Sequence, residues 1–207
     1  MPLFIDVQNE TNGMTTQEML RYLIKERFPG KIAVTASMRA RSVVVLSMVA
    51  EIDPATPIVI CSPGHQFAES LEYRAAIVKR LGLTNISESR GNETEIKDCD
   101  EDHCERMWSE HETLPGRTFS VVHLNKALAP YDCWVSAVYH MPHSEYAQSR
   151  IDVDGRLVFV DPLLGWSQDD VHKYMVEHGL PFHKRAYRQK KYKSRRKGVD
   201  NLQTAHF

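Results

Sequence analysis

A buried strand that runs directly into a polar, basic turn and then into an apolar helix most constrains the fold of this chain. The segment is Lys31 to Ser42, KIAVTASMRARS, and it is followed by the apolar run 43–48. Such a strand brings the unpaired N–H groups and the positive dipole end of the next helix to the edge of a sheet, where phosphate or sulfate can bind. The turn is therefore a candidate anion site.

The turn also supplies side-chain donors of the kind that an oxyanion needs. Hydroxyl groups come from Thr35, Ser37 and Ser42, and guanidinium groups come from Arg39 and Arg41. The alternative is an ordinary helix N-terminus that Ser37 caps beside two solvated arginines. The turn lacks the glycines of G-x-G-x-x-G and of G-x-x-x-x-G-K-[ST], so the residues alone leave both interpretations open.

Helical and strand patterns alternate along most of the chain. Strands are predicted at 32–34, 57–61, 83–87, 133–138 and 156–160, and helices at 43–50, 67–81, 121–129 and after the capping boxes Thr15-x-x-Glu18 and Ser167-x-x-Asp170. This alternation predicts a single α/β domain, a three-layer sandwich with a mostly parallel central sheet. Ligands of such sheets bind beyond the carboxyl ends of the strands.

Composition limits the class of protein. The 207 residues are 42% hydrophobic and 26% charged with a net charge of −1, which is typical of a soluble globular domain. No apolar run approaches the roughly 20 residues that span a bilayer, so we expect a cytoplasmic protein with no membrane partner. The cysteines follow no disulfide spacing and are expected to be reduced; they are Cys61, Cys99, Cys104 and Cys133.

Charge is distributed unevenly. An acidic excursion is predicted at 89–115 within a domain of residues 1–183, with one helix near 104–111, and a basic tail at 184–207. The stretch 184–198 contains nine bases and no acid, with tyrosines interleaved. It could be a solvated or folded-back tail, could bind nucleotide phosphates, or could bind nucleic acid through charge and stacking.

Two further turns follow predicted strands and should meet the first turn at the same sheet edge. The turn after 57–61 offers Ser62, Gly64, His65 and Phe67, with the glycine allowing close approach of the backbone to a ligand. The segment after 133–138 contains Arg150, which could clamp a further anion. Their convergence favours a binding site over scattered surface residues.

The order of these segments resembles the phosphoadenylyl-sulfate (PAPS) reductase family of the PP-loop, adenine nucleotide alpha hydrolase-like superfamily. The resemblance runs from about Lys31 to Gly179, with the closing blocks as its most specific elements. Its segments are Ile32–Ser37, Ile58–Ser70, Val122–Leu128, Asp132–Val138, Ser144–Arg150, Asp161–Val171 and His178–Pro181.

The resemblance implies an enzyme that binds an adenine nucleotide, which would be PAPS, adenosine 5′-phosphosulfate (APS) or ATP, the last with magnesium. A thiol donor such as thioredoxin is an implied partner. The implied contacts to the α-phosphate or sulfate, the adenosine and the outer phosphates are Thr35, Ala36, Ser37, Arg39, Arg41, Ser42, Ser62, Gly64, His65, Phe67, Arg150, Lys190 and Lys193.

The chain also departs from the family pattern. Arg39 stands where a glycine is expected, and no cysteine follows Cys133, whereas reductases of the family use a cysteine in a C-terminal E-C-G-L-H segment. Cys99 and Cys104 are the candidate replacement nucleophiles. We expect no metal site there, because the neighbouring acids disfavour thiolates and the spacing is not that of a zinc knuckle. Thr118-Phe119 stands where iron–sulfur members have a Cys-Cys pair, so no cluster is expected.

Three functions therefore remain after the sequence is considered. The first is a sulfonucleotide reductase-like enzyme that acts at the phosphate or sulfate end of the nucleotide. The second is an ATP-pyrophosphatase-type enzyme that activates a nucleic acid or a small molecule for sulfur transfer. The third is a non-catalytic nucleotide-binding module. The oligomeric state is open, with a homo-oligomer among the options.

Overall fold

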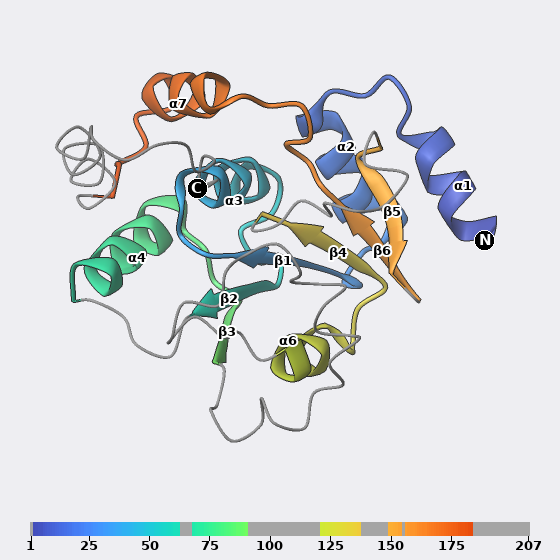
Figure 1. The fold of residues 1–207 in the computed structure, drawn as a ribbon, viewed down its shortest axis with the longest axis horizontal. Helices are drawn as coiled ribbons and strands as arrows, with labels where there is room; N and C mark the ends of the chain where they lie inside the picture. The colour runs from blue at the N-terminus through green and yellow to red at the C-terminus, as the bar shows by residue number, and fades with distance from the viewer. Residues whose placement is uncertain (1, 63–67, 91–120, 138–148, 155, 184–207) are drawn as a thin grey trace, which may run out of the picture.

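The computed structural model describes residues 2–62, 68–90, 121–137, 149–154 and 156–183. The elements, in chain order, are α1 (Pro2–Glu10), α2 (Thr16–Tyr22), the π-helical turn η1 (Leu23–Arg27), β1 (Ile32–Ala36), α3 (Ala40–Ile52), β2 (Ile58–Ser62), α4 (Ala68–Leu81), β3 (Ile86–Arg90), α6 (Val121–Leu128), β4 (Cys133–Ser136), β5 (Ile151–Asp154), β6 (Leu157–Val160) and α7 (Gln168–Glu177). They form a single α/β domain (Figure 1).

The centre of the domain is a six-stranded sheet in the order β3-β2-β1-β4-β6-β5. Strand β1 is parallel to both neighbours, with Val34 opposite Ile58 of β2 and Val135 of β4. Among the described strands, only the edge strand β5 is antiparallel, since it pairs with β6 as a hairpin. The predicted mostly parallel sheet is thus confirmed.

Both faces of the sheet are covered by helices (Figure 1). On one face, Ile32, Val34 and Ala36 of β1 pack into a large core with α2, α3, α4 and α7. On the other, Ala33 packs in a smaller core under α6, which contributes Leu124 and Leu128. A strand buried on both faces is continuously apolar, which explains the IAVTA sequence of β1.

Helix α3 lies within the larger core. It contacts α2, α4 and α7 as well as β1, so residues 42–49 are all buried. A helix that is apolar on all sides needs such enclosure. The helix that follows the candidate anion turn is therefore fixed on every side, and its N-terminus is held rigidly at the sheet edge.

Three features differ from the sequence-based expectations. Strand β3 begins at Ile86, three residues after the predicted start, and extends through Ser89 and Arg90 into the predicted excursion. Neither α1 nor β5 was predicted; they pack against each other, so each is stabilised by the other more than by its own pattern. Residues 91–120, with the predicted helix near 104–111, and the predicted tail 184–207 lie outside the described residues.

Both predicted capping boxes are confirmed. The Thr15 hydroxyl accepts the Glu18 N–H while the Glu18 carboxylate accepts the Thr15 N–H at 2.8 Å. Ser167 and Asp170 make the same reciprocal pair at the start of α7, again at 2.8 Å from backbone nitrogen to carboxylate. Each box satisfies backbone donors that a helix N-terminus leaves unpaired.

Acidification should weaken both boxes. Hydrogen bonds from the Thr15 backbone and then its hydroxyl lower the pKa of Glu18 from its ordinary 4.5, and bonds from the Ser167 hydroxyl and then its backbone lower the pKa of Asp170 from 3.8. A lowered folded-state pKa stabilises the fold above the unfolded pKa, and this contribution is lost as the pH falls through the folded value. We expect NMR titration midpoints below 4.5 and 3.8, respectively. The melting temperature of Glu18→Gln/Asp170→Asn should fall less on acidification than that of the parent protein, and midpoints at the ordinary values would contradict this.

Within the described part of the chain, no helix is long and apolar enough to cross a membrane.

Candidate functional site

The sheet has a topological switch point between β1 and β4. From β1 the chain proceeds outward to β2 and β3, whereas from β4 it proceeds to β6 and β5 on the other side. In α/β sheets, the crevice that binds ligands lies at such a switch point, beyond the carboxyl ends of the strands. The residues that open this crevice are Ser37 after β1 and Ala137 after β4.

The turn that joins β1 to α3 has an unusual backbone conformation. Met38 has a φ of 59°, and it is the only non-glycine residue with positive φ among those the structure describes. A left-handed conformation costs an L-residue about 1–2 kcal/mol, which the burial of the Met38 side chain in the larger core offsets. This conformation was not predicted, because the family resemblance implied a glycine one position later, at Arg39.

Ser42 ties this turn to β4. Its hydroxyl donates to the Ala137 carbonyl at 2.7 Å and accepts the Ser37 N–H at 3.1 Å. The Ser37 hydroxyl lies 3.2 Å from the same oxygen and must be the donor there, because the Ser42 proton is already used. Ser42 is completely buried and Ser37 half-buried, so Ser42 acts as the internal anchor and Ser37 faces the crevice.

The N-terminus of α3 points its backbone donors at this crevice. Val43 is the first residue whose N–H bonds within the helix, to the Arg39 carbonyl at 2.9 Å. The N–H groups of residues 40–42 precede it and have no partner inside the helix. Arg39 occupies the N-cap position with extended backbone, but a guanidinium has no acceptor with which to cap a helix. Backbone donors, a dipole end and an exposed arginine thus lie together.

Arg41 is directed elsewhere. Its guanidinium donates to the carbonyls of Leu163 at 2.9 Å and Trp166 at 3.2 Å, and it lies 3.7 Å from the Asp161 carboxylate. Burial lowers the pKa of Arg41, and Asp161 opposes that shift. This arginine connects α3 to the loop 161–166 after β6. Asp161 was not predicted as a site residue, although an acid directly after a buried strand at the carboxyl edge is a usable signal.

Thr35 and Ala36 lie within the sheet. The Thr35 hydroxyl is completely buried and accepts the Trp134 indole N–H at 2.8 Å, on the face that α6 covers. Ala36 packs in the larger core on the opposite face. Neither side chain reaches the turn that begins at Ser37.

Arg150 lies at the same sheet edge, beside the end of β6. Its guanidinium donates to the Met14 carbonyl at 2.8 Å, and its own carbonyl accepts the Asp161 N–H at 2.9 Å. It is half-buried. The structure thus places Arg150 at the predicted edge and gives it a backbone partner in the turn before α2.

Ser62 ends β2 at the carboxyl edge, paired in register with Arg90 of β3. The remaining predicted contacts lie outside the described residues; they are Gly64, His65, Phe67, Lys190 and Lys193. The candidate nucleophiles Cys99 and Cys104 also lie outside them.

The described chain ends close to this edge. His183 Nε2 lies 3.1 Å from the hydroxyl of Ser70 in the first turn of α4, and the Tyr73 phenol donates to the Pro181 carbonyl at 2.7 Å. Burial raises the pKa of Tyr73 to about 12, so the phenol remains a donor at any physiological pH. Because α4 starts at the carboxyl edge after β2, His183, the last described residue, lies on the same side of the sheet as the turn 37–42.

Cys133 is fully buried at the start of β4, and burial raises its pKa far above that of an ordinary thiol. We expect this thiol to resist iodoacetamide and disulfide reagents in the folded protein and to react only after unfolding. Peptide mass spectrometry of native and denatured samples measures this directly. Rapid labelling of Cys133 in the native protein would show that the start of β4 opens.

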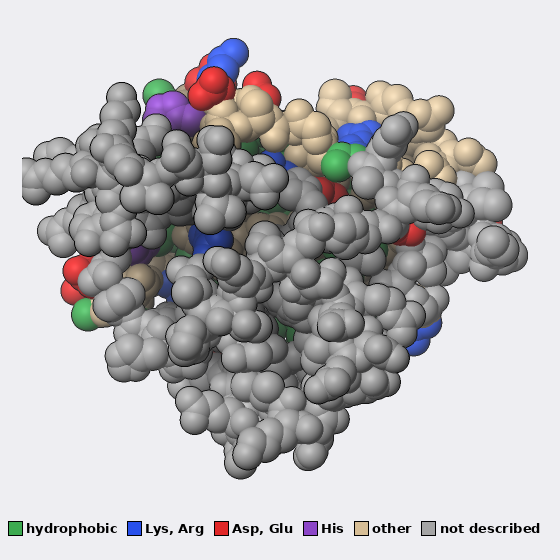
Figure 2. All heavy atoms as spheres, in the orientation of Figure 1, with side chains coloured by type: hydrophobic (Ala, Val, Ile, Leu, Met, Phe, Trp, Pro, Cys, Tyr) green, Lys and Arg blue, Asp and Glu red, His purple; other side chains and the backbone are tan. Residues whose placement is uncertain are grey.

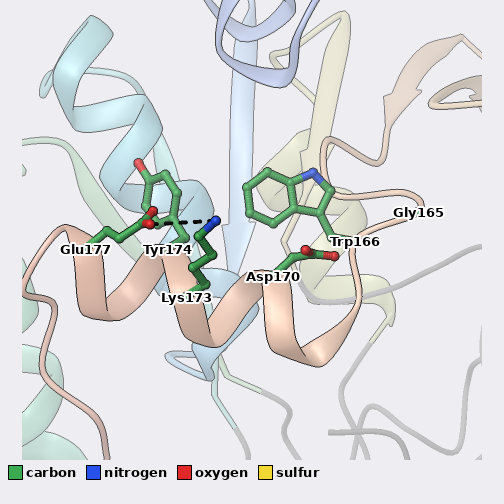
Figure 3. A pocket seen from close by; sticks show the side chains of 6 residues that line it. All are labelled: Gly165, Trp166, Asp170, Lys173, Tyr174 and Glu177. Atoms are coloured by element: carbon green, nitrogen blue, oxygen red, sulfur yellow. Dashed lines mark ion pairs between the residues drawn. The ribbon is translucent and has the colours of Figure 1, made fainter.

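A second hollow, of about 350 Å³, lies along α7 beside the loop that Arg41 holds. Figure 3 shows the rings of Trp166 and Tyr174 on the same side of the helix, with Lys173 between them and paired to Glu177 at 3.8 Å. Charged and histidine side chains gather at the top left of Figure 2, where Figure 1 places α7. Both carboxylates that line the hollow have partners: Glu177 pairs with Lys173, and Asp170 accepts a hydrogen bond from the Ser167 hydroxyl.

Known proteins resemble this chain over most of its length. Residues 31–194 match the model of the phosphoadenosine phosphosulfate reductase domain. The chain is 27% identical over 183 residues to the phosphoadenosine 5′-phosphosulfate reductase of Alkalilimnicola ehrlichii, covering 86% of this chain and 73% of that protein. It is 29% identical over 164 residues to the adenosine 5′-phosphosulfate reductase of Mesorhizobium japonicum, covering 79% of this chain and 64% of the relative.

A solved structure supports the fold. The crystal structure of phosphoadenylyl-sulfate reductase from Candida auris, a phosphate complex, superposes with a TM-score of 0.63 at 17% identity. The match covers 90% of each chain.

Proposed function

This chain belongs to the phosphoadenosine phosphosulfate reductase domain family, enzymes of the sulfonucleotide reductase type, and from that premise we propose that it binds PAPS or APS with the sulfate end at the N-terminus of α3. The observation that carries the proposal is the turn 37–42, where the N–H groups of residues 40–42, which have no partner within α3, lie beside the exposed Arg39 at the switch point of the sheet. A helix N-terminus favours anions by both its donors and its dipole.

The adenosine and the remaining phosphates are assigned to the neighbouring turns. Ser62 at the end of β2 supports a role for the segment with Gly64, His65 and Phe67 in enclosing the adenosine. Arg150 lies at the same edge, and the departure of the chain from His183 beside α4 supports contributions from Lys190 and Lys193 to the outer phosphates.

The proposed reaction is reduction of the sulfonucleotide by thiols. A cysteine thiolate attacks the sulfate sulfur, a sulfur–sulfur bond forms, and the bond to the phosphate oxygen breaks so that the nucleotide leaves with that electron pair. A second thiol, from a donor such as thioredoxin, then attacks the cysteine sulfur, which gives a disulfide and releases sulfite. Cys99 and Cys104 are the proposed nucleophiles, and the buried, high-pKa thiol of Cys133 is unsuited to the task.

Isothermal titration with PAPS, APS and ATP, with and without magnesium, tests the binding step. We expect selective binding of a sulfonucleotide, weakened in Arg39→Gln. Selective binding of ATP with magnesium would instead assign the chain to ATP-dependent activation, and binding of none of the three would refute the nucleotide site. A parallel titration with single-stranded DNA tests whether the segment 184–198 binds nucleic acid instead of nucleotide phosphates.

Sulfite release in the presence of dithiothreitol or thioredoxin tests the chemistry. We expect Cys99→Ala or Cys104→Ala to abolish turnover while nucleotide affinity remains, and the matched control Cys133→Ala to retain both. Turnover that survives in Cys99→Ala/Cys104→Ala would exclude both thiols as the nucleophile.

A further inference from the structure

Building on the proposed function, we infer that Arg41 is a positioning residue, which sets the orientation of the anion-binding turn by bridging α3 to the loop 161–166. The family resemblance implied a direct contact of Arg41 with phosphate or sulfate. The arrangement of its partners supports a different role. The two roles predict opposite effects on ligand affinity when the neighbouring Asp161 carboxylate is replaced.

The donors of Arg41 are directed to the protein itself. Nη2 donates to the Leu163 carbonyl and lies near the Asp161 carboxylate, and Nη1 donates to the Trp166 carbonyl. The side chain is only 23% exposed, and that of Asp161 is 7% exposed. A guanidinium presents its donors in one plane, so a group that spans two carbonyls of one loop has a fixed orientation. Its charge is also balanced locally by Asp161.

The loop that receives these bonds is itself firmly held. The Asp161 carboxylate accepts the Leu163 N–H at 3.1 Å, and the Asp161 N–H donates to the Arg150 carbonyl at 2.9 Å. On the far side, the Thr16 hydroxyl donates to the Pro162 carbonyl at 3.1 Å. The loop is therefore a rigid point of attachment, and Arg41 transmits its position to the first turn of α3.

The next residue, Ser42, similarly connects the first turn of α3 to the chain after β4. Ser42 reaches the Ala137 carbonyl, so consecutive residues tie the first turn of α3 to the chain after β4 and to the chain after β6. These two anchors fix the direction of the N–H groups of residues 40–42 at the crevice. Arg39 is the exposed arginine of this turn, and the proposed function assigns the contact with the anion to it.

Substitutions at both ends of the bridge separate positioning from direct contact. If Arg41 bound the anion, Arg41→Lys would retain most affinity for PAPS, and Asp161→Asn would tighten binding by releasing a competing charge. If Arg41 positions the turn, lysine cannot span both carbonyls, so Arg41→Lys and Arg41→Gln should each weaken binding about tenfold, and Asp161→Asn should weaken it severalfold, because small displacements of binding groups are costly.

Arg156 provides the matched control. It also donates to backbone carbonyls, of Tyr131 at 2.6 Å and Leu128 at 3.3 Å, but at the amino edge of the sheet. We expect Arg156→Gln to change affinity by less than about twofold whatever it does to stability. Wild-type affinity in Arg41→Lys, or unchanged or tighter binding in Asp161→Asn, would overturn the inference.

Hydrogen exchange makes the test independent of the ligand. Arg41→Gln should accelerate exchange in peptides covering 37–46 and 161–168, and Arg156→Gln should leave both unchanged. If the wild-type protein bound no sulfonucleotide, the proposed function would be refuted. Hydrogen exchange would still show whether Arg41 connects α3 to the loop 161–166. If exchange in both peptides were unaffected by Arg41→Gln, the bridge itself would be refuted.

Discussion

Replacing Arg39 with aspartate should abolish sulfonucleotide binding while the N-cap position of α3 gains a side-chain cap. Arg39 occupies the N-cap position of α3 with φ −84° and ψ 167°, which is the backbone conformation of an ordinary cap. An aspartate there would accept hydrogen bonds from the first-turn N–H groups and would interact favourably with the helix dipole. It would thus occupy the donors proposed for the sulfate, and its charge would repel the ligand.

The expected loss of affinity is at least about 100-fold, equivalent to about 2.7 kcal/mol, while the cap should add about 1 kcal/mol to the free energy of unfolding. Titration with PAPS and APS measures the first quantity and urea unfolding the second. Arg39→Gln removes the charge without adding a cap, and Arg39→Ser adds a cap without a negative charge, so these variants should lose less affinity. Retained binding in Arg39→Asp, or a joint loss of binding and stability, would contradict the assignment of the anion to this helix.

Trp134→Ala should cost the most stability of any substitution considered. The indole is 2% exposed, packs edge-on against Phe159 with ring centroids 5.1 Å apart, and donates to the Thr35 hydroxyl. Truncation of such an aromatic side chain removes about 3–5 kcal/mol, a large share of the roughly 5–15 kcal/mol that stabilises a typical domain. Urea unfolding measures the loss, and a loss below about 1 kcal/mol would show that the smaller core is not well packed.

Two further variants separate packing from the hydrogen bond. Trp134→Phe keeps an aromatic ring and should lose less stability than Trp134→Ala. Thr35→Val leaves the buried indole N–H unpaired and should cost about 1–3 kcal/mol of stability. Trp134→Phe/Thr35→Val removes both partners of the hydrogen bond. Its loss of unfolding free energy should therefore be smaller than the sum of the losses in the two single variants. Because the Thr35 hydroxyl is engaged inside the sheet, we expect the double variant to retain affinity for the sulfonucleotide.

The local elements were predictable from the sequence because their causes are local. The Thr15 and Ser167 capping boxes involve residues three apart, and the alternation of apolar strands with helical patterns specifies a parallel sheet by period and connection length. The strand, turn and helix of residues 32–52, where we propose that the anion binds, were predictable for the same reason, since this order of elements places backbone donors at the carboxyl edge. The π-helical turn η1 and the left-handed Met38 were not predicted, because no local pattern in this chain favours either.

The partners of the polar side chains were decided by the tertiary structure. From the sequence, Thr35, Arg41 and Ser42 were expected to contact the anion, but their actual partners come from positions about 100 residues or more away in the chain. The Trp134 indole N–H donates to the Thr35 hydroxyl, and the Ser42 hydroxyl donates to the Ala137 carbonyl. The guanidinium of Arg41 donates to the loop after β6. A buried polar group must form a hydrogen bond, and the fold decides which partner lies close enough. The role of such a group therefore depends on how elements far apart in the chain pack together. The sequence by itself therefore determined where an anion site could form, and only the folded arrangement decided which side chains of the turn build it and which are left to face the ligand.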